Sequence, residues 1–100
     1  DMVIRGGENV PVAEVEDVLL RHPDVDEIAV VGLPDERLGE RACAVVATRN
    51  PALTLADLTA ALAAAGMAKQ FWPEQLVLMA EMPHTPSGKI QKYKLRDSIS

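Results

Sequence analysis

The sequence predicts an α+β fold, in which helices flank a three-stranded sheet and a short N-terminal β-hairpin precedes them. Three observations support this class. Strand-length runs rich in Val, Leu and Ile alternate with segments of helical periodicity. Pro and Gly residues separate these segments. The 100 residues are enough for one small domain, and the order βαββαβ with a terminal helix predicts about two layers.

The first predicted element is the hairpin. Residues 2–5 form a short β-prone run that meets Gly6 and Gly7. A Gly–Gly pair at this place indicates either a hairpin turn with positive φ or a close approach of the backbone to another molecule. A helix follows, with Asn9 as a candidate N-cap and Pro11 in its first turn.

Two mainly apolar runs come next, and each predicts a buried strand. Residues 25–33 are rich in β-branched side chains up to Pro34, which is expected to end the strand because proline lacks an amide donor. Residues 41–48 are expected to pair antiparallel with the first strand across the charged loop 35–40. Cys43 lies in this second run, where a buried and unreactive thiol is expected.

The second helix is marked at both of its ends. Thr54 and Asp57 have the spacing of a capping box, and Gly66 is a typical residue to follow a helix. A third strand over residues 75–79 and a short basic helix over residues 90–99 complete the prediction. The two aromatic residues of the connector before the third strand are expected to fill a gap between helix and sheet.

The loop from Pro83 to Lys89 is the most distinctive stretch. Its two prolines fix φ and remove two donors, so neither a helix nor a central strand can run through it. Pro86 and Gly88 occupy the second and fourth positions of a predicted tight turn, which leaves Lys89 at the end of a stiff, exposed loop. A lysine ammonium suits phosphate and carboxylate oxygens, although an ordinary surface lysine has the same pattern. A Walker A loop is excluded, because Pro83 stands five positions before Gly88.

Composition and charge narrow the function. The net charge of −5 and the pI of about 4.9 argue against non-specific nucleic-acid binding. The charge is uneven, since nine of the fifteen acidic residues lie between Glu14 and Glu40, while residues 87–96 carry four basic residues and no acid. No segment predicts a signal peptide or a membrane span, so a cytoplasmic location is expected. The opening at Asp1 without a start methionine predicts a piece of a larger polypeptide.

The sequence contains no pattern typical of a complete active site. No Ser, Cys or Lys stands in a recognisable nucleophile–base arrangement, no Cys/His spacing predicts a metal site, and no Gly-rich phosphate loop opens a helix. The residues alone therefore predict a binding or lid module that offers one lysine to a site built elsewhere.

Four separated stretches resemble the C-terminal domain of the adenylate-forming enzymes, and the acyl-CoA synthetases (fatty-acid or other carboxylate–CoA ligases) most closely. They are DMVIRGGEN at 1–9, AEVE at 13–16, GLPDERLGE at 32–40 and PHTPSGK at 83–89. The resemblance implies that residues 1–100 are a single mobile C-terminal lid domain. It also implies that an N-terminal domain absent from this chain binds ATP, Mg²⁺ and a carboxylic acid. The parent would be an AMP-forming acid–CoA ligase, and the isolated fragment would be inactive.

The resemblance further implies two working poses about a hinge next to Asp1. In the first pose Lys89 enters the site, where its ammonium neutralises the charge that builds as the carboxylate attacks the α-phosphate. In the second pose, after domain rotation, Gly6 and Gly7 line the passage for the coenzyme A thiol, which a side chain would block. Glu8 and Lys92 are further candidate contacts with coenzyme A, and no residue of this domain is expected to bind metal. A simple hairpin turn remains an alternative explanation for the glycines.

Two features depart from the family pattern. Pro11 comes one position early before the first helix, and the connector 69–74 is bulkier than the usual Lys-x-Pro-Glu. Two other functions also remain open. One is the corresponding domain of a peptide-synthetase adenylation unit, whose acceptor is a carrier protein, and Gly6 followed by Gly7 counts against it. The other is an interaction module that kept the fold but lost the chemistry, for which an intact Lys89 and Gly7 would be unnecessary.

Overall fold

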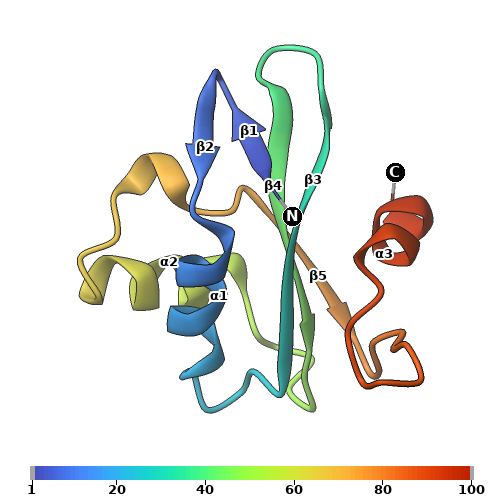
Figure 1. The fold of residues 1–100 in the computed structure, drawn as a ribbon. Coiled ribbons are helices and arrows are strands. Elements are labelled where there is room, and N and C mark those ends of the chain that lie inside the picture. Colours follow the sequence, from blue (N-terminus) through green and yellow to red (C-terminus); the bar gives the residue numbers. More distant parts are fainter. Residues whose placement is uncertain (1, 100) are drawn as a thin grey trace.

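The computed structural model describes residues 2–99 and shows a sheet with helices on both of its faces (Figure 1). The α+β class is therefore confirmed. Asp1, which was expected next to a hinge, lies outside the described residues. The elements in chain order are β1 (Val3–Arg5), β2 (Glu8–Val10), α1 (Val12–Leu20), β3 (Glu27–Asp35), β4 (Gly39–Ala47), α2 (Leu55–Ala64), the 3₁₀ turn η1 (Lys69–Phe71), β5 (Gln75–Met79) and α3 (Lys92–Ile99).

Strand β4 is the centre of the sheet. β3 pairs with it antiparallel over all nine residues of each strand, and both strands extend into the predicted charged loop. β5 pairs with β4 in parallel, and β1 joins β4 through the single pair Arg5–Gly39. The predicted three-stranded sheet is thus β3, β4 and β5, and the predicted hairpin extends it to five strands.

The domain has three layers rather than the two that we expected. Helices α1 and α2 cover one face of the sheet, and α3 covers the other (Figure 1). Successive residues of β3 therefore enter two different cores, with Val30 on the α1–α2 side and Val31 on the α3 side. Because both faces are covered, β3 and β4 are almost continuous apolar runs in the sequence. Because the apolar runs are continuous, the sequence pattern does not indicate which face each helix covers.

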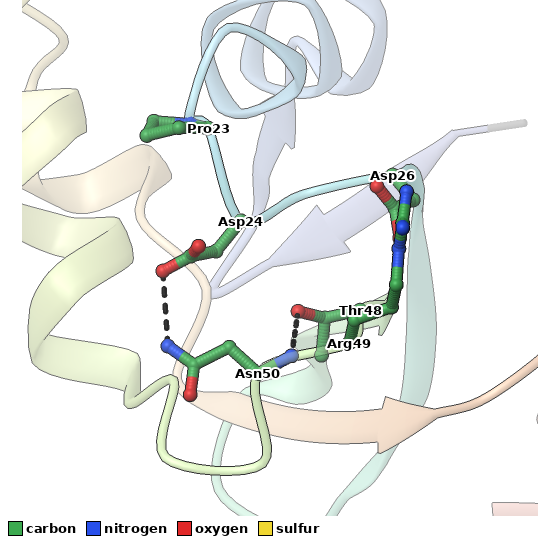
Figure 2. Close-up of a pocket in the computed structure, with 6 residues that line it drawn as sticks. All are labelled: Pro23, Asp24, Asp26, Thr48, Arg49 and Asn50. Carbon is green, nitrogen blue, oxygen red and sulfur yellow. Dashed lines mark hydrogen bonds and ion pairs between the residues drawn. The ribbon is translucent and has the colours of Figure 1, made fainter.

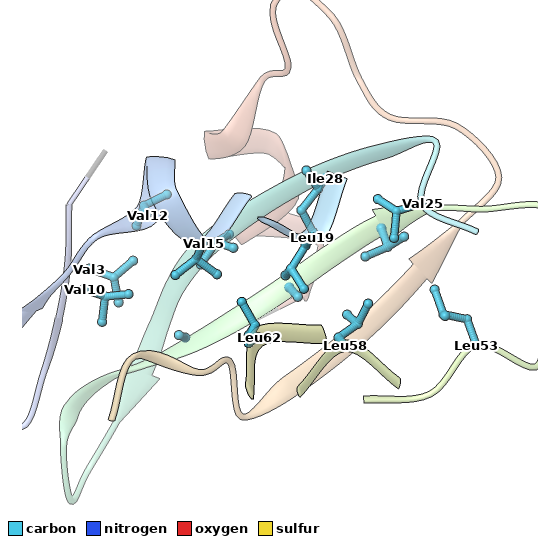
Figure 3. Close-up of a cluster of buried hydrophobic side chains, with 14 residues drawn as sticks. Val3, Val10, Val12, Val15, Leu19, Val25, Ile28, Leu53, Leu58 and Leu62 are labelled. Carbon is cyan, nitrogen blue, oxygen red and sulfur yellow. The ribbon is translucent and has the colours of Figure 1, made fainter. Parts of the chain in front are cut away.

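The larger core lies between the sheet and the helices α1 and α2 (Figure 3). Leu19, Leu58 and Leu62 are fully buried there, and each such side chain stabilises the fold by roughly 1.5–3 kcal/mol. Phe71 and Trp72 pack against this core from the connector, as predicted.

Both ends of α2 have the predicted geometry. The Asp57 amide donates to Thr54 Oγ1 at 3.2 Å, and the Thr54 amide donates to Asp57 Oδ2 at 2.9 Å, so the capping box is confirmed. The hydrogen bond from the Thr54 amide, followed by the interaction with the Thr54 side chain, lowers the pKa of the Asp57 carboxyl. Gly66 has a φ of +78°, and its amide donates to the Ala63 carbonyl to close the helix.

The start of α1 differs from the prediction. Asn9 is not its N-cap, because Asn9 pairs with Ile4 in the hairpin ladder. Pro11 occupies the N-cap position and makes no side-chain hydrogen bond there. The helix begins at Val12 without a polar cap, and its buried apolar face holds it in place instead.

Pro34 does not end β3, which also corrects the prediction. The strand continues to Asp35, and Pro34 pairs with Glu40 of β4. The Val30 amide donates to the Glu16 carboxylate at 2.8 Å and so points away from β4. Val30 lies four residues before Pro34, so the two backbone nitrogens face the same side of the strand. The missing amide of Pro34 therefore faces the outer edge of the sheet, where no ladder hydrogen bond is lost.

Candidate functional site

The proline loop joins β5 to α3 and is held by its own hydrogen bonds. The Gly88 amide donates to the Thr85 carbonyl at 2.9 Å, which closes the predicted tight turn with Pro86 at its second position. The Lys89 amide donates to Thr85 Oγ1 at 3.1 Å, and the Thr85 amide donates to the Lys89 carbonyl at 2.7 Å. The loop therefore presents Lys89 from a fixed backbone.

The Lys89 side chain is exposed, as predicted. Within residues 2–99, its ammonium takes part in no hydrogen bond or ion pair. The charge is therefore available to an anionic ligand that comes from outside this domain.

His84 fixes the loop to one end of the sheet. Its Nε2 lies 2.5 Å from Oε2 of Glu27, the first residue of β3. Its backbone also bridges Ile90 across the loop. Sequence reasoning selected neither partner, because 57 positions separate His84 from Glu27 and no spacing pattern connects them.

Gly6 and Gly7 form the two-residue turn between β1 and β2. Their φ values are +58° and +84°, and a type I′ hairpin turn requires positive φ at both positions. A Cβ on Gly7 would meet nothing within 4 Å, and one on Gly6 would lie 3.6 Å from Leu38 Cδ2. Within this domain the glycines are therefore needed for backbone conformation and not for space. The coenzyme A role remains a prediction.

The two other predicted ligand contacts have partners inside the domain. Glu8 Oε2 accepts a hydrogen bond from Gln70 Nε2 at 2.9 Å. Lys92 Nζ lies 2.9 Å from Glu16 Oε2, and only 16% of its side chain is exposed. Glu16 also accepts the Val30 amide, so Lys92 connects α3 to α1 and β3. Glu8 and Lys92 thus have structural roles that need no ligand, and their contacts with coenzyme A remain predictions.

The glycine turn and the Lys89 loop lie at opposite ends of the sheet (Figure 1). The Gly6 amide donates to the Leu38 carbonyl at 2.9 Å, beside the connection from β3 to β4. The Lys89 loop contacts Glu27, at the start of β3. The nine residues of β3 separate these contacts by about 26 Å, at roughly 3.3 Å per residue. In one orientation of the domain, the two tips therefore cannot both lie at a single reacting centre.

A polar hollow of about 330 Å³ lies where β3 begins and β4 ends (Figure 2). Its polar groups bind one another, since Asn50 Nδ2 donates to Asp24 Oδ2 at 3.0 Å and Arg49 Nε lies 3.7 Å from Asp26 Oδ2. These contacts order the connection from β4 to α2, and no predicted site residue lines the hollow. The lining residues are Pro23, Asp24, Asp26, Thr48, Arg49 and Asn50.

The remaining functional possibilities within residues 2–99 are a metal site, a membrane-spanning helix and a reactive cysteine. No group of three or more His, Cys, Asp or Glu side chains in this range is placed to hold a metal ion. No helix in the same range combines the length and apolar character needed to cross a membrane. Cys43 is fully buried, and desolvation raises the pKa of its thiol to about 11, in agreement with the predicted unreactive cysteine.

Fold and site together define a small α+β domain that presents its functional candidates at two exposed tips. The family model described as the AMP-binding enzyme C-terminal domain matches residues 14–89. The chain belongs to this family, so the resemblance to the C-terminal domain of adenylate-forming acyl-CoA synthetases is confirmed.

Three relatives illustrate the family. The medium-chain fatty-acid–CoA ligase of Escherichia coli (strain K12) is 46% identical over 101 residues, which cover 99% of this chain and 18% of the ligase. The salicyl-AMP ligase / salicyl-S-ArCP synthetase of Mycobacterium tuberculosis (strain ATCC 25618 / H37Rv) is 44% identical over 92% of this chain and 16% of its own length. The solved structure of a Mycobacterium tuberculosis fatty acyl CoA synthetase has a TM-score of 0.91 at 38% identity, over 100% of this chain and 20% of that one. The chain thus spans a fifth or less of each relative.

Proposed function

We propose that this chain is the mobile C-terminal domain of an AMP-forming acyl-CoA synthetase. An N-terminal domain outside the chain would bind ATP, Mg²⁺ and a carboxylic acid, and the assembled protein would work in the cytoplasm. The isolated domain is expected to have no turnover. The observation that carries this proposal is that the Lys89 loop, whose ammonium has no partner within residues 2–99, and the Gly6–Gly7 turn lie at opposite ends of β3. A rotation of the domain would bring each tip in turn to one reacting centre.

Lys89 would act in the first step, the formation of the acyl-adenylate. A carboxylate oxygen attacks the α-phosphorus of ATP, and the bond to pyrophosphate breaks. This attack brings two anions together and builds negative charge, which a positioned ammonium stabilises. The exposed side chain and fixed backbone of Lys89 suit this electrostatic role, which involves no proton transfer.

The Gly6–Gly7 turn would act in the second step. The thiolate of coenzyme A attacks the acyl carbonyl, and AMP leaves. A turn without side chains leaves room for the narrow pantetheine arm beside the acyl-adenylate. Glu8, next to the turn, and Lys92 are the further contacts with coenzyme A that we propose.

The two half-reactions of the full-length protein test the proposal. Lys89→Ala should slow ATP–pyrophosphate exchange by roughly 10²–10³-fold, the usual effect of removing one electrostatic stabiliser. The same variant should form thioester from preformed acyl-adenylate at the normal rate. Lys94→Ala, which removes another exposed lysine, is the matched control and should change neither rate. Equal losses in both half-reactions of Lys89→Ala would refute the role of Lys89.

Loading of a carrier protein is the second candidate function. It is favoured by the relative named salicyl-S-ArCP synthetase, which is 44% identical to this chain. The two chemistries share the first half-reaction and differ only in the thiol acceptor. A panel of carboxylic acids in ATP–pyrophosphate exchange should identify the substrate. Release of AMP with coenzyme A or with a phosphopantetheinyl carrier protein then decides between the two functions.

A further inference from the structure

The two residues that flank the Gly6–Gly7 turn, Arg5 and Glu8, both contact the connector before β5. Arg5 and Glu8 are partners in the hairpin register, a position in which opposite charges commonly interact. Arg5 Nε instead lies 2.6 Å from Glu74 Oε1, and Arg5 Nη1 donates to the Gln70 carbonyl at 2.7 Å. Glu8 Oε2 accepts from Gln70 Nε2 at 2.9 Å. We call Arg5, Glu8, Gln70 and Glu74 the hairpin clamp.

The clamp connects the hairpin to the centre of the sheet. The Glu74 amide donates to the Ala42 carbonyl at 2.9 Å, so Glu74 is fixed to β4. The side chains of Arg5 and Glu74 are only 26% and 25% exposed, which partly shields their charges from water. The guanidinium uses two donors in a fixed orientation, and this geometry restricts its partners more than a single point charge would.

Besides the clamp, backbone contacts with the β3–β4 connection and β4 hold the hairpin near its turn, namely the bond from the Gly6 amide to the Leu38 carbonyl and the Arg5–Gly39 pair. Each of its strands has only three residues, and a two-stranded hairpin of this size is not stable by itself. Val3 and Val10 bury its base in the α1–α2 core. Arg5 and Glu8 lie on the same face as these valines, because residues two positions apart share a face. The clamp therefore continues the anchoring of the hairpin up to the turn.

We propose that Arg5, Gln70 and Glu74 are positioning residues for thioester formation, which hold the Gly6–Gly7 turn in its working orientation. This inference rests on the proposed function of the turn. A displacement of about 1 Å in a group that sets the approach of a reactant lowers a rate by about 100-fold. Adenylation should not depend on the clamp, because the Lys89 loop contacts Glu27 at the start of β3, at the other end of the sheet.

Hydrogen exchange in the full-length protein tests the clamp without any measurement of activity. Arg5→Ala should raise the exchange of amides in residues 2–10 by about tenfold or more, because it removes the two hydrogen bonds that the Arg5 guanidinium donates to the connector. Exchange in residues 43–47, which have no hydrogen bond to the clamp, should stay unchanged. Arg49→Ala, which removes the exposed pair with Asp26 at the other end of β3, is the control and should affect neither segment. Unchanged exchange in residues 2–10 of Arg5→Ala would overturn the inference.

The half-reactions then distinguish positioning from general stability. Arg5→Ala should slow thioester formation from preformed acyl-adenylate by roughly 10–100-fold and leave ATP–pyrophosphate exchange within about twofold. Arg5→Lys keeps a charge near Glu74 but lacks the fork of donors, so it should recover part of the rate. Equal losses in both half-reactions, without recovery in Arg5→Lys, would show a purely structural role and overturn the proposal.

A milder substitution keeps the proposal testable if Arg5→Ala does not fold. Gln70→Ala keeps the backbone carbonyl that Arg5 uses and removes only the contact with Glu8, so it should give a smaller loss in the same step. If Gln70→Ala and Arg5→Lys both form thioester at the normal rate, the inference is contradicted. A wild-type protein that forms acyl-adenylate but passes it to no thiol would refute the proposed function instead, and the exchange measurement would still decide on the clamp.

Discussion

The Lys89 loop and the Gly6–Gly7 turn are both exposed tips, but different kinds of contact hold them. Prolines and hydrogen bonds between residues only a few positions apart stiffen the Lys89 loop, and one distant contact, between His84 and Glu27, anchors it to the sheet. The glycine turn depends on Leu38, Gln70 and Glu74, which are about 30 to 70 positions away in the chain. The loop should therefore tolerate changes elsewhere in the domain, and the turn should be sensitive to them.

The two tips also offer opposite chemical properties. The loop presents an ammonium without a partner in residues 2–99, and the turn presents backbone without side chains. In the proposed cycle the Lys89 loop stabilises negative charge, and the Gly6–Gly7 turn leaves space for the pantetheine arm. A change at one tip should consequently affect one half-reaction only.

The largest effect in this comparison is expected from Gly7→Asn. Asparagine tolerates positive φ better than other residues with a side chain, so the turn should persist while its tip gains bulk. Thioester formation should fall by about 100-fold, as expected when the approach of a reactant is disturbed, and adenylation should be unchanged. The control Gly66→Asn places the same residue at φ +78° after α2 and should change neither half-reaction.

Gly7→Leu separates the two explanations of this glycine further. Leucine in the left-handed region costs about 1–2 kcal/mol of folding stability, so this variant should show a lower free energy of unfolding in addition to the lost thioester step. If Gly7 serves only the turn, Gly7→Asn should be nearly harmless. Gly7→Leu should in that case weaken both half-reactions together.

A smaller effect is expected at the other tip from the pair of His84 and Glu27. Each side chain is about one third exposed, at 35% and 36%, and such pairs contribute about 1 kcal/mol or less. Since the loop also has its own hydrogen bonds, His84→Ala should slow adenylation by about fivefold at most and spare thioester formation. A double-mutant cycle with Glu27→Ala measures the coupling. Additive effects of the two substitutions would contradict an anchoring role for this pair.

Turns and helix ends were the predictable parts of the fold. The capping box at Thr54, the helix end at Gly66 and the turn before Lys89 each depend on neighbouring residues, and all were predicted correctly. The errors at Asn9 and Pro34 involve partners that are also close in the sequence, since Asn9 pairs with Ile4 and Pro34 pairs with Glu40. In both cases strand pairing overrides the preference of the single residue for a helix cap or a strand end.

Within the candidate site, the features set by neighbouring residues were predictable and the distant contacts were not. The exposure of Lys89 and the turn at Gly6–Gly7 follow from local chemistry and were predicted from the sequence. The supporting residues Glu27 and Glu74 were not, because each has its partner 57 or 69 positions away. Lys92 was predicted as a ligand contact because it lies in a basic cluster of the sequence. That cluster does not indicate the ion pair that Lys92 forms with Glu16 inside the domain.

The smallest predicted effect concerns Asp35, which supports the turn indirectly. Asp35 Oδ1 accepts the amides of Arg37 and Leu38 at 2.9 and 2.8 Å, and the Leu38 carbonyl in turn accepts the Gly6 amide. The bond from Leu38 is the main cause that lowers the pKa of the Asp35 carboxyl.

A carboxyl with a lowered pKa in the folded state contributes its stability in full above the unfolded value of about 3.9, and loses it as pH falls through the lower folded value. An NMR titration of the Leu38 amide should therefore have its midpoint below the ordinary aspartate pKa, and Asp35→Asn should abolish the titration. At neutral pH that variant should slow thioester formation by less than about threefold, because an exposed charge contributes little, and leave adenylation unchanged. A loss confined to adenylation would mean that the two tips are coupled through β3, and the separation proposed here would be wrong.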